Sequence, residues 1–132
     1  MKPQLIAQRL HDLGIAQIGT NLFLFDMPAD CIAGILVKMP LTGVAIDHEL
    51  PGYYHDDIQV IVRAAKFATG QAMADQVMAA LTLYEHEFRD GGGVLLMKVN
   101  HMLPRTLPIV YRRSEGNQRE WSMNFMCSCV IP

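Results

Sequence analysis

The sequence predicts an α+β or mixed α/β fold, with an N-terminal helix and one long helix on one face of a largely antiparallel sheet. Three observations indicate this fold: helical spacing of apolar residues in two segments, alternation of apolar and polar residues in others, and a turn between two extended runs near the C-terminus. A chain of 132 residues is close to the commonest domain size, so residues 1–132 are expected to form one domain.

The first expected helix runs from Pro3 to Leu13. Its apolar residues recur at helical spacing, Pro3 is tolerated in a first turn, and Gly14 is well placed as a stop. A second helix of about five turns is expected between residues 73 and 88, after a turn at "AKFATGQ". One face of that helix would carry Met73, Val77, Ala80, Leu81, Tyr84 and Phe88.

The expected strands lie between these helices and after them. Two short ones are residues 22–25 and 31–38, and residues 57–64 alternate as a half-buried strand does. Residues 94–101 form another, and two extended runs around Ser114-Glu115-Gly116-Asn117 form a hairpin. In its second arm one face would carry Trp121, Met123, Phe125, Cys127, Cys129 and Ile131. Proline-containing loops are expected at Pro40–Gly52 and Met102–Pro108, and long loops in compact domains are often functional.

Charge and hydropathy exclude several classes of protein. The formal net charge is −2 and the basic residues are scattered apart from Arg112-Arg113, so a sequence-specific DNA-binding protein is not expected. No apolar run approaches the roughly 18 to 20 residues that span a bilayer, and charges interrupt the N-terminal segment. The chain is therefore expected to be soluble and unsecreted.

A candidate metal or acid–base cluster is His55-Asp56-Asp57, which enters a predicted strand. Because successive side chains of a strand alternate between faces, at most His55 and Asp57 would share one face. A structural or interface role is the favoured interpretation, and a small metal-dependent hydrolase is the alternative.

The remaining candidate chemistry has simpler interpretations. Asp47-His48-Glu49 is expected on a solvated loop, and Glu85-His86-Glu87 on the solvated surface of the long helix. The cysteines are expected to be reduced and mostly buried, because Cys127 and Cys129 share the apolar face with Trp121 and Phe125. A zinc site is not expected, because two further well-spaced ligands are missing. No serine sits in a G-x-S-x-G turn. A ligand pocket lined by Trp121 and the apolar face from Met73 to Phe88 is a minor alternative.

The order of segments resembles a known family over essentially the whole chain. The segments are "LGIAQIGTNLFLFDMPADCIAGI", then "LPGYYHDDIQVIVRAAKFATGQAMADQVMAAL", a strand, a proline-containing loop and a C-terminal strand with the pattern R, W and NF. The most telling part is the strand "IQVIVRA" followed by the alanine-rich helix "QAMADQVMAAL". This layout resembles the tail terminator, or minor capsid, proteins of tailed bacteriophages.

The resemblance implies a structural protein without catalytic residues or cofactors. It implies a ring, typically sixfold, that caps the finished tail tube, ends tube growth and faces head completion proteins in the neck of the virion. DNA would pass through the ring without sequence-specific binding. Another head-to-tail connector protein is the closest alternative. Loops and the hairpin would reach neighbouring subunits, and the candidate interface residues are Asp47, Glu49, Asp56, Asp57, Arg105, Arg112 and Arg113.

Overall fold

The computed structural model describes residues 2–28, 30–40, 43–112 and 118–132. Within them the chain forms two helices, α1 (Pro3–Asp12) and α2 (Phe67–Leu81), and seven strands. The strands are β1 (Leu22–Leu24), β2 (Gly34–Lys38), β3 (Tyr53–Ala64), β4 (Leu83–Arg89), β5 (Leu95–Pro104), β6 (Ile109–Arg112) and β7 (Arg119–Val130).

The strands form one sheet in the order β1-β2-β3-β7-β5-β4, and β6 also pairs with β7. Every pairing is antiparallel except that of β1 with β2. Both helices pack on the same sheet, α1 against β1 and β2 and α2 against β3 and β7. The predicted fold class is therefore confirmed.

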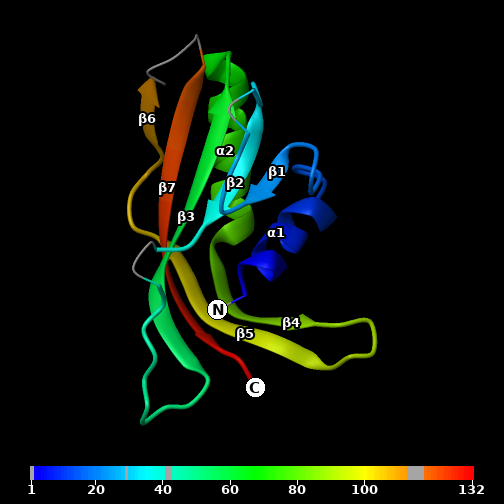
Figure 1. Ribbon diagram of the computed structural model, residues 1–132, viewed down its shortest axis with the longest axis vertical. Coiled ribbons are helices and arrows are strands. Elements are labelled where there is room, and N and C mark those ends of the chain that lie inside the picture. The colour runs from blue at the N-terminus through cyan, green and yellow to red at the C-terminus, as the bar shows by residue number, and fades with distance from the viewer. Residues whose placement is uncertain (1, 29, 41–42, 113–117) are drawn as a thin grey trace.

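Two long strands give the sheet its shape. β3 and β7 pair along their whole length, from Tyr53 opposite Val130 to Ala64 opposite Arg119. The other edge of β7 is shared, because β6 pairs with its first part and β5 with its second part. Figure 1 shows the result as an upper half, with β1, β2 and β6, and a lower half, with β4 and β5. We call these the β6 half and the β4 half.

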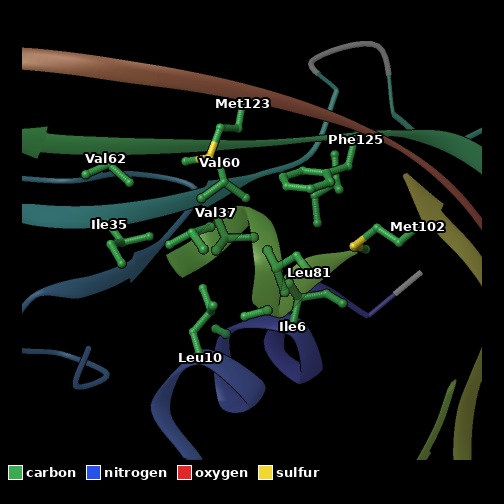
Figure 2. Close-up of a cluster of buried hydrophobic side chains, with 14 of the residues drawn as sticks. Ile6, Leu10, Ile35, Val37, Val60, Val62, Leu81, Met102, Met123 and Phe125 are labelled. Carbon is green, nitrogen blue, oxygen red and sulfur yellow. The ribbon is translucent and has the colours of Figure 1, made fainter. Parts of the chain in front are cut away.

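The core lies between the helices and one face of the sheet. Figure 2 shows Ile6 and Leu10 of α1 and Leu81 of α2 facing Val37 and Phe125 of the sheet. All five side chains are fully buried. The alternating sequence of the strands places these apolar residues on one side, and the helical spacing of α1 and α2 provides the matching faces.

The second helix differs from the sequence prediction at both ends. It begins at Phe67, where a turn was expected, and ends at Leu81, because Thr82 is extended. Tyr84, Phe88 and the segment Glu85-His86-Glu87 therefore lie on β4, and their prediction as helix is wrong. Residues four apart share a face in a strand as well as in a helix, so the spacing of the Tyr84–Phe88 pair fits both structures.

The strand boundaries differ from the predictions at four places. β3 already begins at Tyr53, so the His55-Asp56-Asp57 cluster lies inside a strand and not before one. β5 continues to Pro104, so only residues 105–108 of the predicted Met102–Pro108 loop separate it from β6. A proline is tolerated at the end of a strand because its missing N–H is not needed there. The first two strands are shorter than expected and cover Leu22–Leu24 and Gly34–Lys38.

The C-terminal hairpin is confirmed as the antiparallel pair β6–β7. The predicted core face of β7 is confirmed for Trp121, Met123, Phe125, Cys127 and Cys129, which are fully buried. Its last predicted member, Ile131, follows the end of the strand and packs on the core while only partly buried. The predicted turn at residues 114–117 lies outside the described residues. In the part of the chain that the structure describes, neither helix is long and apolar enough to cross a membrane.

Candidate subunit interface

The structure places Arg105 and Asp57 together. Arg105 follows the end of β5, and its guanidinium donates hydrogen bonds to the Asp57 carboxylate of β3 at 2.7 and 2.9 Å. The two side chains are about half exposed, 50% for Arg105 and 47% for Asp57. Ion pairs with this exposure add little to stability, so both groups can still interact with another molecule.

The other predicted acidic residues make local hydrogen bonds. Asp56 accepts one from the backbone N–H of Asp57 at 2.7 Å, and Asp47 accepts one from the backbone N–H of Glu49 at 2.9 Å. Asp56 and Asp57 line an open hollow of about 340 Å³ with Lys38. Asp47 and Glu49 line a second hollow, of about 460 Å³, on the long loop.

Arg112 lies away from these acidic residues, at the end of β6 in the other half of the sheet. It is exposed and stands directly opposite Arg119 of β7. Arg113 lies outside the described residues. The candidate residues that the structure describes therefore occupy three separate places: Asp47 and Glu49 on the long loop, Asp56 and Asp57 with Arg105, and Arg112 at the end of β6. The one ion pair among these described candidates is that of Asp57 with Arg105.

A buried ionic network, which the sequence analysis missed, lies on the sheet face opposite the helices. Arg63 of β3 is 6% exposed, and its Nε lies 3.1 Å from a Glu120 carboxylate oxygen. Its Nη1 donates to the carbonyl oxygens of Pro28 at 3.1 Å and Cys31 at 2.9 Å. The arginine therefore ties the segment before β2 onto the sheet.

Tyr111 extends this network to β6. Burial, together with the charge of Glu120 and a hydrogen bond to it, raises the pKa of the Tyr111 hydroxyl. Alternation along residues 57–64 places Arg63 on the polar face of β3, but nothing in that pattern shows that the segment before β2 covers it. The sequence therefore indicates that Arg63 is on the polar face of the strand, but it does not predict that the Arg63 side chain is buried.

The segment that Arg63 holds also carries an exposed surface. Met27 is buried and packs on Leu36 and Ile61, whereas Phe25 and Ile32 are 60% and 65% exposed. Asp26 and Asp30, between them in the sequence, are exposed as well. Most of this segment lies between the strands expected at residues 22–25 and 31–38, so its combination of exposed apolar and acidic side chains was not predicted.

The His55-Asp56-Asp57 cluster does not gather ligands in the structure. His55 is exposed, and its ring centroid lies 6.1 Å from that of His101. Among the residues that the structure describes, no three His, Cys, Asp or Glu side chains are placed to hold one metal ion.

Glu85-His86-Glu87 is on β4, beside α1. His86 lines a hollow of about 250 Å³ together with Leu5 and Arg9 of that helix. Burial, with a smaller effect of the Arg9 charge, lowers the pKa of His86. Glu87 is bonded to Arg89 at 2.7 Å. The segment is thus part of a charged strand, in which Glu87 pairs with Arg89 of the same strand.

The thiols divide into a buried pair and a half-buried residue. Cys127 and Cys129 are fully buried on the core face of β7, and Cys31 is partly accessible. The hydrogen bond between Cys127 and Cys129 raises the pKa of Cys127 and lowers that of Cys129 to about 7. None of the three cysteines, all of which lie in the described chain, is in a disulfide.

We expect native alkylation to separate these cysteines. At pH 8, Cys31 should react with iodoacetamide first, while Cys127 and Cys129 should react at least about 100-fold more slowly, because reagent reaches them only when the core opens. Intact mass spectrometry over time measures the rates, with the unfolded chain as the control. Equal labelling of all three residues in the native protein would mean that the core face of β7 is assigned wrongly.

Comparison with known proteins identifies the family. A family model described as "Bacteriophage tail terminator protein" matches residues 9–131. A solved chain from the virion of a native gene transfer agent particle has a similar fold: TM-score 0.65, 19% identity, and coverage of 95% of this chain and 91% of that chain. A second solved chain, 20% identical over 96% of both chains, has a TM-score of 0.43, too low to support an argument. No curated protein matches the chain. Because the family model matches nearly the whole sequence, the chain belongs to the bacteriophage tail terminator protein family, whose members are structural tail proteins and not enzymes.

Proposed function

We propose that the protein assembles as a ring, with six copies as the expected number, on the end of the tail tube. The ring ends tube growth and joins the tail to the head completion proteins, and DNA passes through it without sequence-specific binding. The protein would assemble in the host cytoplasm and remain at the tail or neck of the virion.

The observation that carries this proposal, beyond family membership, is the free edge of β6. All four residues of the strand are exposed, and β6 pairs only with β7 among the described residues. A strand with unpaired backbone groups at a sheet edge can pair with another chain, and head-to-tail contacts between identical subunits close into rings when the rotation permits.

The candidate residues enter the proposal as contacts between neighbouring copies. Arg112 and Arg113 of one copy would provide the basic groups of the contact, because a guanidinium makes several hydrogen bonds to carboxylates. The sequence-based partners Asp47, Glu49, Asp56 and Asp57 of a neighbouring copy stay a prediction. Arg105, which is already bonded to Asp57, would hold that part of the surface in place.

Tube growth tests this function directly. Tail tube protein is allowed to polymerise, and the chain is added at increasing ratios before elongation is complete. Elongation should stop at about one ring per tube end, and electron microscopy should show the added density at one end. Unchanged tube lengths with no end density would contradict capping. Binding to portal or adaptor protein alone would favour a different connector protein.

A further inference from the structure

Two exposed surfaces lie on the β6 half of the molecule, one on the edge strand β6 and one on the segment that covers β2 and β3. The first, which we call the β6 surface, consists of Leu107, Ile109, Val110, Tyr111 and Arg112. Its four large apolar side chains are between 40% and 80% exposed, with Leu107 the highest at 80%. An apolar cluster on a strand with a free edge is typical of a protein contact.

The β6 surface also has an unbalanced charge. Arg112 and Arg119 stand opposite each other on β6 and β7, and like charges in this position destabilise a strand pair. Arg119 stacks over the ring of Phe67 at 5.9 Å, whereas the guanidinium of Arg112 has no partner among the described residues. No aspartate or glutamate occurs between Leu95 and Arg112 in the sequence. A carboxylate from another molecule would relieve this repulsion.

The second surface, which we call the acidic surface, consists of Phe25, Asp26, Asp30 and Ile32. Both apolar side chains are more than half exposed, and neither carboxylate has a bonding partner in the described part of the chain. The sequence has no lysine or arginine between Arg9 and Lys38. The buried cation beneath this segment, Arg63, is balanced by Glu120. The acidic surface therefore has the opposite charge to Arg112. Like the β6 surface, it combines charged groups with exposed apolar side chains.

The position of the two surfaces determines what kind of contact they can make. β6 lies at one edge of the sheet, whereas the segment after β1 covers the sheet face opposite the helices, where Met27 packs on Leu36 and Ile61 and Arg63 binds Pro28 and Cys31. Arg112 stands opposite Arg119, which alternates onto the same face as Trp121, so within one chain Arg112 lies on the helix side of the sheet and the acidic surface on the other side. A contact between the two surfaces must join different copies head to tail, and repetition of such a contact generates a closed ring or an open filament.

We propose that the β6 surface of one copy binds the acidic surface of the next, with Arg112 facing Asp26 and Asp30. This inference rests on the ring proposed above and specifies its contact. In this inference Asp26 and Asp30 take the place of Asp47, Glu49, Asp56 and Asp57 as the principal partners of Arg112. Asp57 is already paired with Arg105, and Asp47 and Asp56 accept backbone hydrogen bonds. The carboxylates of Asp26, Asp30 and Glu49 are unpaired in the described residues, and a variant at Asp47 and Glu49 distinguishes the two places.

Charge reversal tests the pairing. Arg112→Glu and the double variant Asp26→Lys with Asp30→Lys should each raise the concentration of half-assembly at least about tenfold, because each places like charges in the contact. Combining all three substitutions in one chain should restore assembly. All three residues are exposed, and unchanged circular dichroism and melting temperature would verify folding. Sedimentation velocity measures the oligomer.

Matched controls separate this contact from a general effect of charge. Arg89→Glu reverses an exposed arginine on β4, and Asp12→Lys with Asp75→Lys reverses two exposed carboxylates on the helices. Both controls should assemble as the wild type does. A third chain combines Arg112→Glu with Asp47→Lys and Glu49→Lys, and it should stay dissociated.

Other outcomes of the charge-reversal experiment would contradict either the pairing or the ring. If the ring forms normally in either test variant, or if both variants dissociate and the combined chain does not recover, the pairing of Arg112 with Asp26 and Asp30 is wrong. Recovery through Asp47 and Glu49 instead would assign the contact to the long loop. A wild-type chain that never oligomerises would overturn the ring proposal itself and this inference with it.

Discussion

Replacing Gly70 with alanine is expected to lower the free energy of unfolding by about 3 kcal/mol, and the melting temperature by roughly 10 °C for a domain of this size. Gly70 is buried in the first turns of α2, and a Cβ there would overlap the Trp121 ring at Cη2 and Cζ3. Trp121 has no room to retreat, since it is fully buried and its indole N–H donates to Gln71 at 3.2 Å.

Gly91→Ala is the matched control, because a Cβ at Gly91 meets no atom within 4 Å. It should change stability by less than about 0.5 kcal/mol, as exposed substitutions usually do. Urea unfolding of both variants measures the difference. A Gly70→Ala variant as stable as the wild type would show that α2 does not pack on β7 as closely as described.

Replacing Arg63 with methionine is expected to cost about 3 to 5 kcal/mol, because the Glu120 carboxylate would remain in a nearly buried position without its cation. The side chains of this pair are only 8% and 13% exposed. Two carbonyl groups, of Pro28 and Cys31, would also lose their donor. The double variant Arg63→Met with Glu120→Gln should recover part of the lost free energy of unfolding, because it also removes the unpaired charge of Glu120.

Arg89→Met is the control for this experiment, since its ion pair with Glu87 is 47% and 44% exposed and should contribute less than about 1 kcal/mol. Chemical unfolding of the wild type, the two variants and the control gives the comparison. If Arg63→Met were no more destabilising than Arg89→Met, the segment before β2 would not be held on the sheet through Arg63.

The sequence predicts the strands well where apolar and polar residues alternate without ambiguity. The core face of β7 follows directly from the positions of Trp121, Phe125 and Cys129, and strict alternation has no helical equivalent. The prediction of one helix from Met73 to Phe88 was wrong at its end, because the last two apolar residues, Tyr84 and Phe88, are four residues apart. This spacing leaves helix and strand equally compatible, and the extended Thr82 separates the two elements.

The candidate interface was only partly accessible from sequence. The basic residue Arg112 was found because an arginine beside a turn in a hairpin arm is conspicuous. Asp26 and Asp30 were missed because their exposure depends on how the segment before β2 folds over the sheet. That fold depends on Arg63, which contacts Pro28 and Cys31 across more than 30 residues of sequence. Alternation within one strand contains no information about such a contact.

The mass of the native particle tests the central claim, ring assembly, most directly. Native mass spectrometry at low micromolar concentration should give one dominant species with six copies of the 14.8-kDa chain. The species should have the same mass over a tenfold range of concentration, because a closed ring has no free contact to add further copies. A chain that stays monomeric at high concentration, and also when mixed with tail tubes, would contradict the account.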